Sequence, residues 1–115
     1  VRSADLDVLE TASKQEYGRA ISSDTASALR KMMVSTVENG TASVARIPGV
    51  QVGGKTGTAE NCSGCQNYSW FVSYASKGGQ DVAVAVMVQK SNASVVSGSG
   101  QAGPIARAIM DAVIK

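Results

Sequence analysis

The chain has 115 residues, of which 43% are hydrophobic and 17% charged, so its composition is that of an ordinary globular protein. The length suits one small domain or part of a larger one. The formal net charge is only +2 and Lys and Arg form no run longer than two residues, which argues against a nucleic-acid partner. No stretch approaches the ~18 consecutive apolar residues of a membrane-spanning helix.

Histidine is absent from the sequence, and this restricts the chemistry. Ser-His-Asp and Cys-His catalysis are excluded, as is any zinc site that needs imidazole. Proton transfer in an enzyme of this composition must therefore use Lys, Asp, Glu or Tyr.

The N-terminal region, residues 1–21, is polar and irregular, and we expect an extended lead-in rather than a regular element. Its first residues, Val1 to Asp5, have neither the basic nor the apolar part of a signal peptide. The chain also has no initiator Met, so we expect a fragment or a processed product.

A helix is predicted over residues 24–39. Ser22 and Asp24 provide an N-cap and an acidic first turn, and Asn39-Gly40 provides a stop. Apolar residues recur at three- and four-residue spacing, which indicates one buried face of the helix. These residues are Ala26, Leu29, Met33 and Val37.

Three strands are predicted next, over residues 50–59, 68–75 and 82–88. A polar loop, 60–67, joins the first two, and a Gly-rich hairpin turn joins the second and third. Valines alternate with alanines and a methionine in the third segment, so both of its faces are apolar. We therefore expect this strand to be central in the sheet and covered on both sides.

A Ser/Gly-rich stretch, residues 91–100, is expected to be mobile, and a final helix is predicted from Gly103-Pro104 to about residue 114. The apolar face of this helix is marked by Ile105, Ile109 and Val113. The order of helix, three antiparallel strands and helix predicts an α+β fold in which helices and a sheet form layers.

The first predicted strand contains an unusual run, Gly53-Gly54-Lys55-Thr56-Gly57-Thr58. Glycines weaken a strand and mark the close approach of a ligand or another backbone, while Thr56 and Thr58 place two hydroxyls on one face. Lys55 adds a positive charge, so this edge could pair with an extended peptide or hold a carboxylate. The alternative is a plain exposed edge with a protective lysine and solubilising threonines.

Cys62 and Cys65 form a Cys-x-x-Cys pattern in the predicted loop 60–67. Redox pairs of this spacing usually begin a helix, whereas these cysteines follow a strand. Two cysteines alone cannot complete a structural zinc site. A local disulfide is the preferred interpretation, with two free thiols, or a redox or metal role, as alternatives.

The segment Lys55-Thr56-Gly57-Thr58-Ala59-Glu60 resembles the Lys-Thr-Gly signature of penicillin-recognising serine acyltransferases. Further segments resemble class B penicillin-binding proteins, most of all the penicillin-binding protein A type of actinobacteria, over essentially all 115 residues. These segments are Arg19-Ala20-Ile21-Ser22, Glu38-Asn39-Gly40-Thr41-Ala42, Ile47-Pro48-Gly49-Val50, Trp70-Phe71-Val72 and Gly103-Pro104-Ile105-Ala106. The resemblance implies the C-terminal portion of a penicillin-recognising serine transpeptidase fold.

Two elements of the family's pattern are absent from this sequence. No Ser is followed by Lys three residues later, so the Ser-x-x-Lys motif with the nucleophile is missing, and no Ser-x-Asn occurs. Both motifs precede the Lys-Thr-Gly element in the family. The resemblance therefore covers only the last third of a transpeptidase domain. We expect residues 1–115 to be an incomplete C-terminal segment that is inactive alone.

The resemblance implies a role for each residue of the matching strand. Lys55 would hydrogen-bond the serine of the Ser-x-Asn motif and stabilise negative charge, and the backbone N–H of Thr58 would form half of the oxyanion hole. The hydroxyls of Thr56 and Thr58 would bind the carboxylate of a stem peptide or β-lactam. Gly57 would let the substrate backbone lie against the strand.

The activity implied by the resemblance is peptidoglycan D,D-transpeptidation, which cross-links stem peptides and is the target of β-lactams. No cofactor or metal is expected. The expected partners are the N-terminal remainder of the same transpeptidase, stem peptides and β-lactams, with membrane anchoring only through that remainder. The expected location is the extracytoplasmic face of the bacterial membrane. The alternative function is a non-catalytic module that binds peptides or β-lactams.

Overall fold

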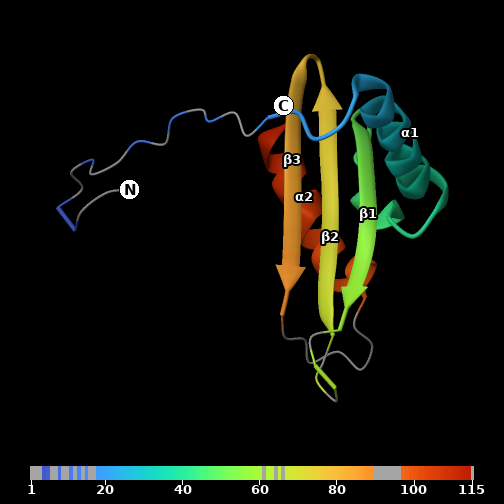
Figure 1. Cartoon of the computed structure of the whole chain (residues 1–115), viewed down its shortest axis with the longest axis vertical. Coiled ribbons are helices and arrows are strands. Elements are labelled where there is room, and N and C mark those ends of the chain that lie inside the picture. The colour runs from blue at the N-terminus through green and yellow to red at the C-terminus, as the bar shows by residue number, and fades with distance from the viewer. Residues whose placement is uncertain are drawn as a thin grey trace.

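The computed structural model of the chain describes residues 4–5, 8, 11, 13, 15, 18–60, 62–63, 65, 67–89 and 97–114. It contains two helices and three strands (Figure 1), in the order α1 (Ser23–Asn39), β1 (Gln51–Ala59), β2 (Tyr68–Lys77), β3 (Gln80–Val88) and α2 (Gly103–Val113). Short helical turns of 3₁₀ and π type lie at Ser43–Ala45 and Gly98–Ala102. The predicted order of helix, three antiparallel strands and helix is confirmed.

Much of the lead-in expected over residues 1–21, and residues 91–96 of the Ser/Gly-rich stretch, lie outside the described residues. Neither helix in the described part of the chain combines the length and the apolar character that crossing a membrane requires.

The sheet has the order β1–β2–β3, and both pairings are antiparallel. The register places Gly57 opposite Trp70, and Trp70 opposite Met87. Two residues along the strands, Lys55 lies opposite Val72. Among the described residues, β1 and β3 are therefore the two edges of the sheet and β2 is its centre.

One face of the sheet packs against α2 and forms the core. Burial alternates along β2, and its inward residues are Ser69, Phe71, Ser73 and Ala75. Phe71 and Met110 are both fully enclosed and join the sheet to α2. On β3 the valines share this face, since Val86 is buried opposite Phe71. We call this side the α2 face of the sheet.

Helix α2 turns a different side to the sheet from the one predicted. The predicted apolar face, Ile105, Ile109 and Val113, is 42–53% exposed. The buried residues of the helix are Gly103, Ala106 and Met110. A Cβ atom on Gly103 would lie 2.6 Å from Val44, so a small residue lets the helix begin close to its neighbours. The helix is apolar on two sides, and periodicity alone does not reveal which side faces the sheet.

Strand β3 also differs from its prediction, because it is an edge of the described sheet and one of its faces is uncovered. On that face Ala83, Ala85 and Met87 are exposed. The same surface continues on β2, where Trp70 and Val72 are 37% and 42% exposed. We call this side the second face of the sheet. Alternating apolar residues correctly indicated two apolar faces, but the described residues cover only one of them.

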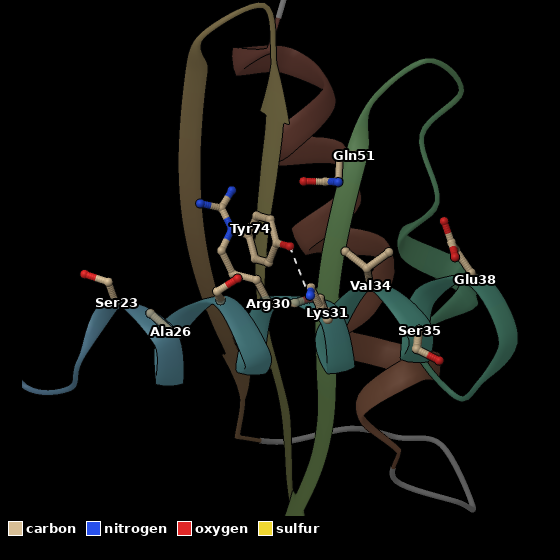
Figure 2. A pocket seen from close by; sticks show the side chains of 10 residues that line it. Ser23, Ala26, Arg30, Lys31, Val34, Ser35, Glu38, Gln51 and Tyr74 are labelled. Atoms are coloured by element: carbon tan, nitrogen blue, oxygen red, sulfur yellow. Dashed lines mark hydrogen bonds between the residues drawn. The ribbon is translucent and has the colours of Figure 1, made fainter.

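Helix α1 crosses the strands on the second face, near the start of β1 (Figure 2). It begins as predicted: the hydroxyl of Ser22 accepts a hydrogen bond of 3.1 Å from the N–H of Thr25. Near the other end, Val37 is 2% exposed and belongs to the core. Leu29, from the predicted buried face, is 46% exposed. Only the C-terminal part of that face is therefore buried by the described residues.

Candidate active-site strand

Strand β1 has an open edge, because only β2 pairs with it in the described sheet. The backbone groups of an antiparallel strand point alternately toward its partner and away from it. The carbonyl oxygen of Gly54 accepts a hydrogen bond from the hydroxyl of Thr36 on α1. The carbonyl oxygen of Thr56 accepts one of 2.6 Å from the ammonium of Lys55. Both carbonyls lie on the open edge, so the N–H of Thr58, two residues further on, lies there as well.

The side chains of β1 place hydroxyls and charge on opposite faces of the strand. Thr56 and Thr58 lie on the α2 face, whereas Lys55 and Gly57 lie on the second face. Lys55 and Thr58 are exposed, and the two residues between them are half-buried. The Lys55 side chain bends over the open edge to reach the carbonyl of Thr56. An ammonium, two hydroxyls and a free N–H therefore gather along one edge.

The glycines of β1 occur for two different structural reasons. A Cβ atom on Gly53 would lie 2.2 Å from the ring of Tyr74, and one on Gly54 would lie 3.0 Å from the ring of Phe71. These two glycines admit aromatic rings, which corrects the expectation that they mark a ligand or another backbone. Among the described residues, a Cβ atom on Gly57 would meet only Trp70 within 4 Å, at 3.2 Å from its Cβ atom. The strand is therefore more open at the glycine of the Lys-Thr-Gly run.

The turn Gly98–Ala102 supports β1 from the α2 face. Gly98 is buried, and a Cβ atom on it would lie 2.7 Å from the backbone nitrogen of Gly57. The hydroxyl of Ser69 donates a hydrogen bond of 2.8 Å to the carbonyl of Ser97 and so anchors the turn to β2. The sequence predicted a mobile stretch here, because Ser and Gly give no apolar period. The turn packs on β1 through backbone atoms, and this kind of contact produces no periodic apolar pattern in the sequence.

Thr41 contacts the same strand, although no role was predicted for it. Its Oγ1 atom lies 3.2 Å from Oγ1 of Thr56. Thr41 follows the last residue of α1 by two positions and is exposed. The only indication in the sequence that Thr41 belongs to the site was its position in the segment from Glu38 to Ala42, which resembles the penicillin-binding proteins.

The loop after β1 carries the two cysteines. Cys62 and Cys65 are joined by a disulfide, with their Cα atoms 5.3 Å apart. The N–H of Cys65 also donates a hydrogen bond of 3.1 Å to the carbonyl of Cys62, which closes a tight turn. Both residues are exposed. Within the described ranges, no group of three or more His, Cys, Asp or Glu residues could hold a metal ion.

A hollow of about 640 Å³ lies between α1 and the start of β1. Figure 2 shows the side chains that line it. Arg30 lies 4.6 Å from the centroid of the Tyr74 ring and 3.6 Å from a carboxylate oxygen of Asp81. Tyr74, and then Asp81, raise the pKa of Arg30 above its ordinary value, so its charge is retained. None of the residues from Lys55 to Thr58 lines this hollow. Its contacts brace α1 against β2 and β3 and do not contribute to the edge described above.

Comparison with known proteins gives the family. A family model described as penicillin binding protein transpeptidase domain matches residues 2–111. The chain belongs to this family. The resemblance inferred from Lys55-Thr56-Gly57-Thr58 and its surroundings is therefore confirmed at the level of the family.

Relatives and solved structures of the transpeptidase family agree. Peptidoglycan D,D-transpeptidase PbpA of Mycolicibacterium smegmatis is 32% identical over 119 residues, which cover all of this chain and 24% of that protein. PbpA of Mycobacterium tuberculosis is 31% identical with the same coverage. This transpeptidase-family chain therefore spans about a quarter of the length of these curated relatives.

Two solved transpeptidase domains share the fold. The D,D-transpeptidase domain of a peptidoglycan glycosyltransferase from Eggerthella lenta is 32% identical, with a TM-score of 0.65 over 99% of this chain and 27% of that one. The transpeptidase domain of the FtsI4 D,D-transpeptidase from Legionella pneumophila is 33% identical, with a TM-score of 0.60 over 80% of this chain and 36% of that one. The predicted fold class is thus that of penicillin-binding transpeptidase domains.

Proposed function

We propose that this chain is the C-terminal segment of a peptidoglycan D,D-transpeptidase that β-lactams inhibit, and that β1 forms one wall of its acyl-transfer site. The observation that carries the proposal is the open edge of β1. An ammonium, two threonine hydroxyls and backbone groups that pair with no other described strand lie together there. Family membership and the D,D-transpeptidase names of the relatives support the same activity.

Lys55 has enough hydrogen-bond donors to contact more than one group at once. An ammonium has three N–H bonds, so Lys55 can keep its hydrogen bond to the Thr56 carbonyl and still contact other groups. We assign it to the serine of a Ser-x-Asn motif and to the negative charge that develops on the substrate. The backbone N–H of Thr58 forms half of the oxyanion hole, where a single donor contributes about 2.7–4 kcal/mol to transition-state stabilisation.

The substrate in this proposal is an extended stem peptide, and a β-lactam takes its place in inhibition. An extended peptide can align with a free sheet edge and pair with its outward backbone groups. Gly57 leaves room at the strand, and the hydroxyls of Thr56 and Thr58 bind the substrate carboxylate. A carboxylate accepts such hydrogen bonds more strongly than a neutral group does.

The nucleophile must come from residues that precede this chain, because no Ser-x-x-Lys or Ser-x-Asn occurs among its 115 residues. The uncovered apolar surfaces support an incomplete domain. They are the second face of the sheet, with Trp70, Val72 and Met87, and the outer side of α2, with Ile105, Ile109 and Val113. Exposed apolar side chains that gather on one face mark an interaction site. We assign it to the remainder of the transpeptidase, which also carries any membrane anchor and places the site on the extracytoplasmic face.

The test is Lys55→Ala in the complete transpeptidase domain that contains this segment. Acylation by a fluorescent penicillin should slow by at least about 100-fold, because a preorganised charge at the reacting centre is lost. The thermal midpoint should change little, since an exposed lysine contributes little to stability.

Lys77→Ala is the matched control, because Lys77 is also an exposed lysine, lies at the far end of β2, and its substitution removes the same charge. It should acylate at the wild-type rate. Wild-type acylation by the Lys55→Ala variant would contradict the catalytic assignment. Reversible binding of penicillin by the wild-type domain without any acylation would instead favour the non-catalytic binding module.

A further inference from the structure

Thr41 is the feature of the site that neither the three family motifs nor the assignments above include. It lies in the turn after α1, yet its hydroxyl oxygen is 3.2 Å from that of Thr56 on β1. Among the described contacts, Thr41 is the only hydrogen-bond partner of the Thr56 hydroxyl. The helix turn and the candidate carboxylate site are therefore joined through two hydroxyl groups.

The turn holds Thr41 in a fixed place. The N–H groups of Gly40 and Ala42 both donate to the carbonyl of Thr36, each at 3.1 Å. Gly40 allows this, because a Cβ atom there would lie 3.1 Å from the same carbonyl oxygen. Ala42 is fully buried, which fixes the far side of the turn in the core. Thr41 is thus an exposed side chain between two anchored neighbours.

A second contact fixes the turn relative to β1. The hydroxyl of Thr36 donates to the carbonyl of Gly54, two residues before Thr56 on the same strand. Helix α1 and the turn that follows it therefore contact two alternate residues of β1: Thr36 contacts Gly54, and Thr41 contacts Thr56. The distance between the Thr41 and Thr56 hydroxyls is therefore set by the backbone contacts of the turn, and not by side-chain rotamers alone.

We propose that Thr41 is a positioning residue for substrate binding: its hydroxyl donates to Thr56 and so directs the Thr56 proton toward the substrate carboxylate. A hydroxyl has one proton to donate and can accept as well. If Thr41 supplies the hydrogen bond that Thr56 accepts, the Thr56 proton remains for the carboxylate. Consecutive hydrogen bonds also polarise one another, which strengthens the outer one. This inference rests on the proposed function, because it needs a carboxylate at Thr56.

The test uses the complete transpeptidase domain, with benzylpenicillin as the probe. Thr41→Val removes the hydroxyl and keeps the branched shape, so the second-order acylation rate should fall about fivefold, the typical effect of one neutral hydrogen bond. The loss should appear in the concentration of penicillin needed for half-maximal acylation, with the limiting rate unchanged. Thr41→Ser retains the hydroxyl and should restore most of the rate.

A double-mutant cycle separates positioning from direct contact. If Thr41 acts through Thr56, Thr41→Val should cause no further loss in a Thr56→Val background. Two losses that simply multiply would mean that Thr41 touches the substrate itself, and this would overturn the proposal. Wild-type behaviour of Thr41→Val would also overturn it, as would a Thr41→Ser variant that is as slow as Thr41→Val.

Failure of this inference can be told from failure of the proposed function. If the wild-type domain is acylated and Lys55→Ala is not, the function stands whatever the Thr41 variants do. If the wild-type domain is not acylated, the function itself falls. A penicillin whose carboxylate is esterified is the ligand control: with this ester, Thr41→Val and wild type should react at the same rate.

Discussion

The two edges of the sheet leave different chemistry exposed. At β1 the open edge carries an ammonium, hydroxyls and outward backbone groups, and α1 contacts only part of it. On β3, beyond the polar Gln80 and Asp81 at its start, the exposed residues are Ala83, Ala85 and Met87, which offer only apolar surface. A polar edge can bind and release a ligand in water, whereas an apolar edge gains most when it is covered permanently. We therefore propose that β1 serves recognition and that the apolar face of β3 serves assembly.

The two sides of α2 are both apolar and differ in whether they are covered. Small and flexible residues face the sheet, while Ile105, Ile109 and Val113 face outward. These outward residues are apolar and exposed, as are Trp70, Val72 and Met87 on the second face of the sheet. Both surfaces gain stability if the remainder of a domain covers them, and neither brings a chemical group to the open edge of β1.

The largest expected effect is a complete loss of acylation in the isolated chain. Incubated with benzylpenicillin, the isolated 115-residue chain should form no covalent adduct, because it has no Ser-x-x-Lys nucleophile. Intact-protein mass spectrometry should show the unmodified mass only, while the complete domain gains one penicillin. A stable adduct on the isolated chain would place a nucleophile within these 115 residues and contradict the assignment of β1 as a wall alone.

The apolar edge can be tested by placing a charge on it. Met87→Lys in the complete domain should lower the free energy of unfolding by about 2–4 kcal/mol, because the new charge would be buried without a partner. In the isolated chain, where Met87 is 44% exposed, the same change should cost little and reduce binding of a hydrophobic dye. Chemical denaturation of both forms measures the difference.

Gln89→Lys, just beyond the end of β3, is the control for this charge. It should leave the stability of the complete domain near that of wild type. If Met87→Lys is as harmless as Gln89→Lys in the complete domain, the second face is not covered there, and the contrast between the two edges disappears.

The smallest expected effect concerns the polar edge. Thr58→Val removes a hydroxyl but keeps the backbone N–H, so acylation of the complete domain by benzylpenicillin should slow about tenfold through weaker carboxylate binding. The thermal midpoint should stay within about 1 °C, because Thr58 is exposed. Stopped-flow acylation beside thermal unfolding measures both. A variant that loses stability and rate together would make Thr58 a structural residue instead.

Sequence reasoning was most successful where one local pattern decides the outcome. Ser22 identified the start of α1, and the run from Gly53 to Thr58 located the edge strand, since caps and glycine-rich strands act within a few residues. The family followed from several such segments together. Each of these signals lies in a short stretch of chain.

Predictions failed where distant neighbours decide. Both sides of α2 are apolar, so the choice of Ala106 and Met110 over Ile105 and Ile109 depends on the space beside the sheet. The turn at Gly98 packs through backbone contacts that have no sequence period. The contact of Thr41 joins residues 15 positions apart. The roles assigned to Lys55, Thr56 and Thr58 remain predictions for the experiments above.

The alternating backbone of β1 also divides its amide hydrogens into two populations. The amides of Lys55 and Gly57 point toward β2, so they should exchange with solvent deuterium slowly, at the rate at which the sheet opens. The amides of Thr56 and Thr58 point outward and should exchange within the dead time of a manual experiment. An extended ligand bound at this edge would slow the second pair and leave the first pair almost unchanged. Neighbouring residues of one strand can therefore report separately on folding and on occupancy.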